Sequence, residues 1–366
     1  MRVLVAPDSF GGTLTAVEAA DAIAAGFRTV NADVDVQRAP LSDGGPGFIE
    51  VLATAMAGER RTHSVRGPLG NPVSAQVLVA DGTAYIEAAQ AAGLHLVDAG
   101  LRDPRRASSY GVGELIGSAL TGVRRVVVGL GGTATNDGGA GLWAALGAQP
   151  EARLAGGGAG LADLTEVLPP HPLAVSLVAA TDVDNPLLGP NGASAVYGPQ
   201  KGADREAVLD LDDALRRWAD VAEACVAQPG LRERPGAGAA GGLGFGLMAL
   251  GAVVTSGFDL VAEAVGLRAR VEAADLVVTG EGRLDAQSLR GKVVIGIARL
   301  AQDAGVPCVA VAGQAEVGRR DAAAAGIDDI EAVADLLGSA KTALEAGAEG
   351  AERAATALAR RWARGE

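Results

Sequence analysis

Several residue types are scarce in this chain of 366 residues, and each scarcity argues against a class of function. Aromatic residues make up 3% of the sequence, too few to predict the stacking platforms that bind single-stranded nucleic acid. The formal net charge is −13 and no basic stripe interrupts it, so neither a nucleic acid nor an anionic membrane surface is an expected partner.

Cysteine and histidine are almost absent as well. The two cysteines, Cys225 and Cys308, predict neither a disulfide framework nor a cysteine metal site. The three histidines, His63, His95 and His171, share no motif, which argues against a histidine-centred triad or a zinc site.

Lysine is rarer than arginine by a wide margin, with 3 lysines against 28 arginines. Where arginine is used so freely, a retained lysine indicates a position that needs a compact point charge, as phosphate sites do. Lys201 and Lys292 both stand in glycine-containing turns, whereas Lys341 lies in an alanine-rich stretch and is expected to be solvated.

Long hydrophobic runs are also missing. Residues 235–258 carry no charge over 24 positions, but eight of them are glycine, so a buried loop followed by a helix is favoured over a membrane span. The apolar run at the N-terminus is too short for a signal peptide and predicts a first strand. We therefore expect a soluble, cytoplasmic protein.

What the chain does have is apolar residues, 49% of the total, arranged as strands that run into loops rich in glycine, aspartate, asparagine and threonine. This pattern and the length predict an α/β protein of two domains. Open α/β sheets bind ligands at the carboxyl ends of their strands. Asp8 and Ser9 follow the first predicted strand, and Asp43 and Gly44 follow the second.

The most distinctive of these loops is residues 126–141, VVVGLGGTATNDGGAG. Gly131 and Gly132 allow a backbone to approach a bound anion closely, and a following helix start would offer unpaired N–H groups. Asn136 and Asp137 are its polar contacts. The alternative is a tight strand-to-helix turn in a glycine-rich protein.

Two further loops carry charged side chains. Asp182, Asp184 and Asn185 follow a predicted strand and offer the hard oxygen ligands that Mg²⁺ prefers, although an Asx-rich turn before a proline gives the same pattern. A later loop holds Glu281, Arg283 and Asp285, with Lys292 following within about two helical turns. The two acids either face a metal or only hold Arg283 in place.

These loops together predict a kinase for a small molecule. Phosphoryl transfer needs backbone N–H groups and cations for the phosphates, carboxylates for Mg²⁺ and an acceptor for the attacking hydroxyl proton. A dinucleotide-dependent oxidoreductase would share the α/β pattern, but no phosphate fingerprint follows the first strand.

Seven motifs carry a family resemblance: APDSF (6–10), SDGG (42–45), SYGVGEL (109–115), GLGGTATNDGGAG (129–141), DVDNPLLGPNGASAVYGPQKGA (182–203), PGAGAAGGLG (235–244) and TGEGRLDAQSLRGK (279–292). Their order and spacing resemble the type I glycerate kinase family from end to end. The resemblance implies ATP- and Mg²⁺-dependent phosphorylation of D-glycerate, with 2-phosphoglycerate slightly favoured over 3-phosphoglycerate as the product. It also implies two α/β domains with strand-end loops lining a cleft between them. Residues 1–80 and 286–366 are expected to form the first domain and 81–285 the inserted second one, in a monomer or homodimer.

The chain departs from the family pattern in two loops. Gly11 stands where the family usually has lysine, and Pro46 and Phe48 stand where it has glutamate and threonine. Phe48 is expected to make one wall of the site more apolar. The acceptor is then a relative of glycerate, or an arginine supplies the missing charge; the candidates are Arg102, Arg105 and Arg106. A non-catalytic small-ligand binding protein is the third alternative.

Roles for individual residues follow from the resemblance. The expected catalytic residues are Asp182, Lys201, Arg283 and Lys292, and Asp182 and Asp184 are the expected Mg²⁺ ligands. The remaining residues expected to contact substrate or phosphate are Asp8, Ser9, Asp43, Gly44, Gly131, Gly132, Asn136, Asp137, Asn185, Glu281 and Asp285.

Overall fold

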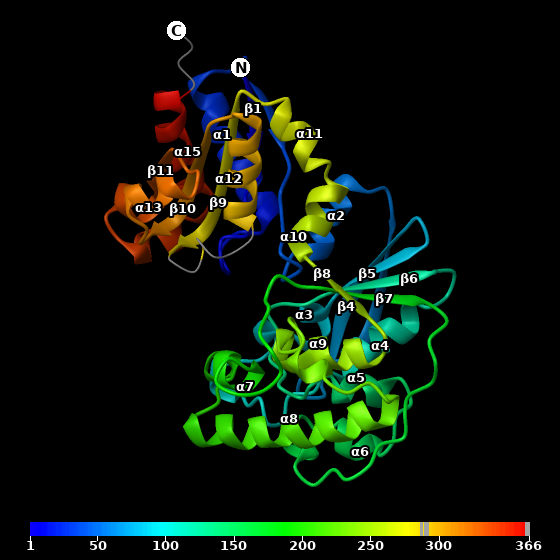
Figure 1. Cartoon of the computed structure of the whole chain (residues 1–366). Coiled ribbons are helices and arrows are strands. Elements are labelled where there is room, and N and C mark those ends of the chain that lie inside the picture. The colour runs from blue at the N-terminus through cyan, green and yellow to red at the C-terminus, as the bar shows by residue number, and fades with distance from the viewer. Residues whose placement is uncertain (286–287, 289–292, 363–366) are drawn as a thin grey trace. The chain divides into compact units, whose positions relative to one another are not determined.

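The computed structural model describes residues 1–285, 288 and 293–362 and confirms the predicted α/β class. The chain divides into two compact units, each with its own sheet and helices (Figure 1). The first unit consists of Met1–Asp43, Glu50–Met56 and Phe258–Glu366, and the second of Gly44–Ile49 and Ala57–Gly257.

The sheet of the first unit has five strands in the order β11-β10-β9-β1-β2, and all its paired strands are parallel. The strands are β1 (Arg2–Val5), β2 (Asp35–Arg38), β9 (Leu276–Leu284), β10 (Cys308–Ala315) and β11 (Asp329–Ala332). The chain adds β2 on one side of β1, and β9, β10 and β11 follow on the other side. The strand order therefore reverses between β1 and β9, the place where such sheets bind ligands.

The helices that lie wholly or mainly in this unit are α1 (Ala16–Val30), α2 (Phe48–Ala55), α10 (Gly257–Ala264), α11 (Leu267–Glu272), α12 (Val293–Ala304), α13 (Arg319–Ala324), α14 (Val333–Leu337) and α15 (Ala340–Trp362). Helix α1 begins with the predicted capping box: Glu18 N donates to Thr15 Oγ1 at 3.2 Å and Thr15 N donates to Glu18 Oε2 at 2.9 Å. Its buried residues Ile23 and Phe27 pack with Val3 and Val5 of β1 and with α15.

The sheet of the second unit has six strands in sequence order: β3 (Glu59–Arg66), β4 (Pro72–Ala80), β5 (Thr83–Glu87), β6 (Arg125–Gly129), β7 (Ser176–Ala180) and β8 (Val253–Thr255). The first three strands pair antiparallel, and β5 through β8 pair parallel.

The expected domain limits need correction at two places. β3 and β4 pair with β5 in this sheet instead of joining the chain ends, and β9 pairs with β1 in the first sheet. Both limits depend on which strands pair, and no change in composition along the sequence marks that pairing. The other expected domain limits stay predictions.

The helices of the second unit are α3 (Ala88–Ala92), α4 (Tyr110–Ala119), α5 (Ala140–Ala145), α6 (Glu151–Leu154), α7 (Ala193–Tyr197), α8 (Arg205–Val226) and α9 (Ala239–Ala249). Short 3-10 turns stand at Leu94–Leu96, Ala99–Leu101, Gly158–Leu161, Pro199–Lys201 and Leu231–Glu233. Trp143 and Trp218 meet edge to face in the core, with ring centroids 5.1 Å apart. Their indole N–H groups donate to Gly246 O and Gly138 O, both at 2.9 Å, so each buried donor is satisfied.

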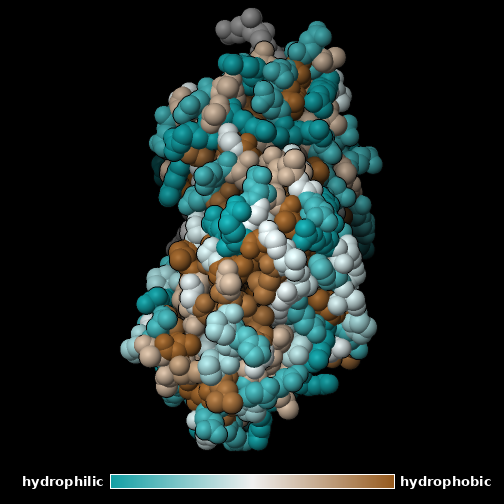
Figure 2. All heavy atoms as spheres, turned by 90° about the vertical axis from the view of Figure 1, so that its right-hand side faces the viewer, coloured by the Kyte–Doolittle hydropathy of each residue, from teal (hydrophilic) through white to brown (hydrophobic). Residues whose placement is uncertain are grey.

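Within the charge-free stretch 235–258, residues 236–249 form a largely buried loop and α9, as predicted, and the remainder contains β8 and the start of α10. Among the helices in the described part of the chain, none has the length and apolar character needed to cross a bilayer. Figure 2 shows hydrophobic residues gathered on one face of the second unit among hydrophilic ones. Exposed apolar side chains of this unit include Leu168 and Val253; partly apolar surfaces are ordinary for folded proteins.

Candidate functional site

The parallel strands of the second unit bring three of the predicted loops to one edge of its sheet. Gly129 of β6 lies opposite Ala180 of β7, so Gly131 and Asp182, each two residues further on, follow neighbouring strand ends. A Cβ atom at Gly44 would stand 2.7 Å from Ala180 O, and one at Gly131 would stand 2.7 Å from Gly45 Cα. Glycine at these positions therefore lets the three loops pack backbone against backbone.

Pro46 and Phe48, which depart from the family pattern, have packing roles here. A Cβ atom at Gly132 would stand 2.7 Å from Pro46 Cγ, so the proline ring lies against this loop. The Phe48 ring is fully buried and lies 6.4 Å, centroid to centroid, from Tyr85. The expectation that Phe48 lines a wall of the site is therefore wrong, because its ring is part of the core.

Glu87, at the end of β5, was not among the expected site residues. Its buried carboxylate accepts a hydrogen bond from Gly47 N at 3.1 Å, which holds the loop that carries Gly44 and Pro46. The sequence signal that could have identified Glu87 is an acidic residue at the last position of a strand whose residues alternate in polarity.

Asp137 is fully buried, and its carboxylate accepts hydrogen bonds from its own loop and from Ser109. Its carboxylate accepts from Ser109 N at 2.7 Å, Ser109 Oγ at 2.9 Å, Gly139 N at 3.2 Å and Gly141 N at 3.3 Å. Burial raises the pKa of this carboxyl, and the four donors act in the opposite direction. These contacts tie the turn to the starts of α4 and α5.

Asn136, its neighbour, is also fully buried, and its Nδ2 donates to Ser194 Oγ at 2.8 Å. Its amide oxygen and the hydroxyl of Thr133 are buried without a hydrogen-bond partner among the described residues. Such atoms are costly to leave unpaired, so they indicate a polar group that the described residues do not supply.

Lys201 is buried in the turn Pro199–Lys201, where its Nζ donates to Thr135 O at 2.7 Å. Burial lowers the pKa of this lysine to about 7, and the nearby Asp137 carboxylate acts in the opposite direction. The contact holds the backbone of the glycine-rich loop. Its expected contact with phosphate stays a prediction.

Asp182 is half-buried and Asp184 exposed on the loop after β7. Asn185 on the same loop donates through Nδ2 to Asn191 O at 2.8 Å and accepts from the Tyr197 hydroxyl at 2.7 Å, so its amide organises the loop. Across the described residues, no group of three or more acid, histidine or cysteine side chains is arranged to hold a metal. Mg²⁺ commonly needs only one or two carboxylates beside substrate phosphates, and the two aspartates fit that requirement.

In the first unit, the predicted acids gather where the strand order reverses. Asp8 N donates to Gly280 O at 2.8 Å, which places the end of β1 beside the end of β9. The pKa of Asp8 is raised to about 8, first by burial and then by the carboxylates of Asp43 and Glu281. Burial, with a smaller contribution from Asp285, raises the pKa of Glu281 to about 7. Asp8, Asp43 and Glu281 thus lie near one another.

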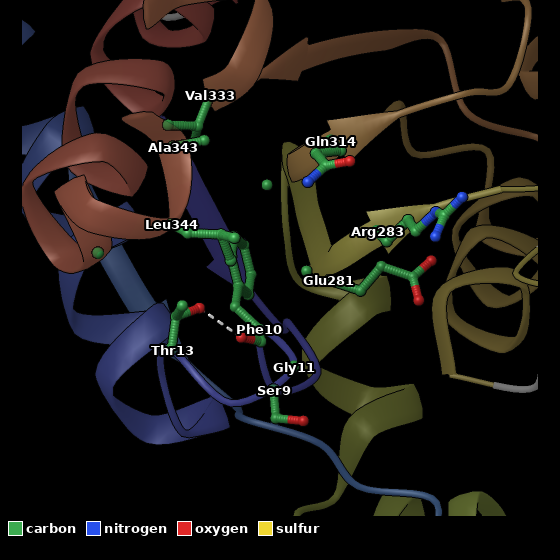
Figure 3. A pocket seen from close by; sticks show the side chains of 13 residues that line it. Ser9, Phe10, Gly11, Thr13, Glu281, Arg283, Gln314, Val333, Ala343 and Leu344 are labelled. Atoms are coloured by element: carbon green, nitrogen blue, oxygen red, sulfur yellow. Dashed lines mark hydrogen bonds between the residues drawn. The ribbon is translucent and has the colours of Figure 1, made fainter. Parts of the chain in front are cut away.

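A pocket of about 260 Å³ opens at this place (Figure 3). It is lined by predicted residues, Ser9, Glu281 and Arg283, and by residues that were not selected, including Thr13, Gln314 and Leu344. Gly11 also lines it, and a Cβ atom there would meet nothing within 4 Å. The one available signal for Gln314 was its place beside a glycine after a predicted strand.

The predicted cations differ in their surroundings. Arg283 is exposed, donates to Glu316 Oε1 at 2.7 Å and lies 3.7 Å from Asp285 Oδ2, so Asp285 does help to hold it. Lys292 lies outside the described residues. In the second unit, Arg105 forms an ion pair with Asp103 at 3.0 Å. One of the three arginines considered as substitutes for a lysine at position 11 is therefore already paired.

Comparisons with known proteins agree on one family. The model of the glycerate kinase family matches residues 3–363. The chain is 42% identical to a glycerate kinase of Bacillus subtilis (strain 168), over 98% of this chain and 97% of that protein. It is 43% identical to the glycerate 2-kinase of Escherichia coli (strain K12), over 86% and 85% of the two chains. It also matches the crystal structure of a candidate glycerate kinase 2 from Salmonella typhimurium LT2, with a TM-score of 0.78, 39% identity and coverage of 99% and 98%. These matches confirm the predicted enzyme class, and the chain belongs to the glycerate kinase family.

Proposed function

We propose that this glycerate kinase transfers the γ-phosphoryl group of ATP to a hydroxyl of D-glycerate with Mg²⁺ as cofactor. The observation that carries the proposal is that the glycine loop at Gly131 and the loop that bears Asp182 follow the neighbouring parallel strands β6 and β7, at the carboxyl ends of both. Exposed backbone N–H groups bind phosphate oxygens, and carboxylates bind Mg²⁺ or a hydroxyl proton.

In the proposed reaction, a glycerate hydroxyl oxygen forms a bond to the γ-phosphorus while the bond from that phosphorus to the bridging β,γ-oxygen breaks. ADP leaves with the electron pair, and the hydroxyl proton passes to a carboxylate. Asp182, the more buried of the two aspartates, orients the hydroxyl and takes this proton. Asp182 and Asp184 are the carboxylates that would hold Mg²⁺, which neutralises charge on the phosphate oxygens when bound.

The unpaired buried groups of the second unit support binding of a polyhydroxylated acid. The Thr133 hydroxyl and the Asn136 amide oxygen lack partners within the described chain. The hydroxyl can donate to the carboxylate of glycerate, and the amide oxygen can accept from one of its hydroxyl groups. Buried polar groups of this kind reject analogues that lack the matching hydroxyl.

The function is tested by ADP release in a coupled assay with D-glycerate and Mg-ATP. We expect release that depends on glycerate and stops on chelation of the metal. Asp182→Asn lowers kcat by about 10²- to 10⁴-fold, because the variant cannot take the proton; Asp213→Asn, an exposed aspartate on α8, serves as the matched control. ADP release independent of glycerate, or wild-type turnover by Asp182→Asn, would contradict the respective assignment.

Product identity follows from proton-coupled phosphorus NMR. We propose 2-phosphoglycerate, supported by the similarity to a protein named glycerate 2-kinase. Its phosphorus couples to a single methine proton and gives a doublet, whereas 3-phosphoglycerate gives a triplet from the methylene group. Parallel assays with other small hydroxy acids test whether Gly11 and Pro46 accompany a changed acceptor.

A further inference from the structure

We propose that the pocket of the first unit binds the nucleoside part of the phosphoryl donor, its base and ribose, and not glycerate. This inference rests on the proposed function and assigns one reactant to a pocket with named walls. The pocket is lined by residues after β1, by residues in the last parts of β9 and β10, and by residues of α14 and α15, all within this unit.

Its position is the first argument. Ser9 and Gly11 follow β1, and Glu281 and Gly282 belong to the end of β9, the two strands between which the order of the sheet reverses. Crevices at such reversals, at the carboxyl ends of parallel strands, are where doubly wound sheets bind nucleotides.

The walls of the pocket match a base and a ribose. Figure 3 shows Val333, Ala343 and Leu344 on the helix side and Gln314 and Glu281 at the strand ends. The apolar side chains suit the faces of a base, and a carboxamide presents both a donor and an acceptor to its edge. A carboxylate at a strand end suits a ribose hydroxyl.

Charge argues against glycerate as the occupant. The charged lining residues in the described part of the chain are Glu281 and Arg283. Arg283 is already paired with Glu316 at 2.7 Å, and Asp8 and Asp43 add further carboxyl groups nearby. Among the described lining residues, an anionic substrate would therefore find only a cation that is already paired, whereas an uncharged nucleoside needs none.

The volume of the pocket also favours a nucleoside over glycerate. The volume of about 260 Å³ approaches the roughly 300 Å³ at which pockets begin to hold drug-sized ligands. A nucleoside would occupy most of this space, and the three-carbon skeleton of glycerate would leave most of it empty.

The experiment measures adenosine binding to the full chain by titration calorimetry, together with KM for ATP and for glycerate. Gln314→Leu removes the carboxamide but keeps the size of the side chain, and Gln302→Leu on the exposed side of α12 is its matched control. We expect wild-type protein to bind adenosine and Gln314→Leu to weaken that binding and raise KM for ATP about tenfold, with KM for glycerate unchanged.

A second pair of variants guards against effects of folding. Leu344 lines the pocket with 55% of its surface exposed, and Leu336 on α14 is 39% exposed and is not a lining residue. Leu344→Ala should weaken adenosine binding, whereas Leu336→Ala should not, with melting temperatures unchanged in both.

The results separate this proposal from the proposed function. Adenosine binding that Gln314→Leu weakens supports the pocket assignment even if no ADP is released with glycerate. The pocket assignment is overturned if ADP release depends on glycerate as expected but Gln314→Leu changes only KM for glycerate, or changes neither KM. In that case the kinase function still stands.

Discussion

Lys201 shows how burial can give a charged residue a role that its sequence context does not reveal. Scarcity marked it as a residue retained for a reason, and the structure places its Nζ against Thr135 O inside the protein. At about 7, its pKa lies well below the usual value for lysine because the charged form is desolvated. The lysine therefore holds a loop in place through its hydrogen bond, but burying its charged form lowers the stability of the folded protein.

We predict that Lys201→Met flattens the rise of stability with pH above neutrality. The folded-state pKa is lower than the unfolded one, so between about pH 7 and the unfolded pKa of about 10.4 the unfolded chain binds more protons, and stability rises with pH. In this window, the difference in free energy of unfolding between wild type and variant should shift in favour of wild type by up to about 1.4 kcal/mol per pH unit. Urea unfolding at pH 7, 8.5 and 10 measures it. Parallel pH profiles for the two proteins would contradict the assignment.

At the scale of single elements, the start of α9 depends on backbone conformations that favour glycine. Ala240, Gly241 and Gly242 all have positive φ, at 53°, 71° and 86°, and they pack against the loop at Thr135 to Gly138. Gly138 N donates to Gly241 O at 3.1 Å. The kink therefore fits the glycine-rich loop closely.

We predict that Gly241→Ala destabilises the protein much more than Gly251→Ala. Both glycines have positive φ, at 71° and 88°, so each alanine costs about 1–2 kcal/mol of left-handed strain. Only at Gly241 would the new Cβ overlap Thr135 O; at Gly251 nothing lies within 4 Å. Chemical denaturation should show an additional loss of at least about 2 kcal/mol in Gly241→Ala. Equal losses in the two variants would mean that the contact with Thr135 relaxes freely.

At the scale of the whole molecule, two separate sets of buried residues support the two units. Ile23 and Leu358 belong to the core of the first, and Trp143 and Leu215 to the core of the second. Each unit thus has the independent core that is typical of a domain.

We predict that Ile23→Ala loosens the first unit selectively. Emptying this fully buried position costs about 2–5 kcal/mol, because apolar contacts are lost and a cavity remains. Hydrogen–deuterium exchange should accelerate in peptides from α1, β1 and α15 and stay unchanged in those from α5 and α8. Uniform acceleration throughout the chain would instead indicate a single cooperative unit.

Local sequence patterns were enough to predict the α/β class, the capping box before α1, the buried glycine-rich segment and the family, because periodicity, caps and long motifs are properties of neighbouring residues. Tertiary structure alone placed β9 beside β1, where Thr279 donates to Ala6 across 273 positions of the chain. It also buried Phe48, gave Asp137 and Lys201 their partners, and brought Gln314 to a pocket. Strand order and burial depend on contacts between distant segments, which no local pattern encodes.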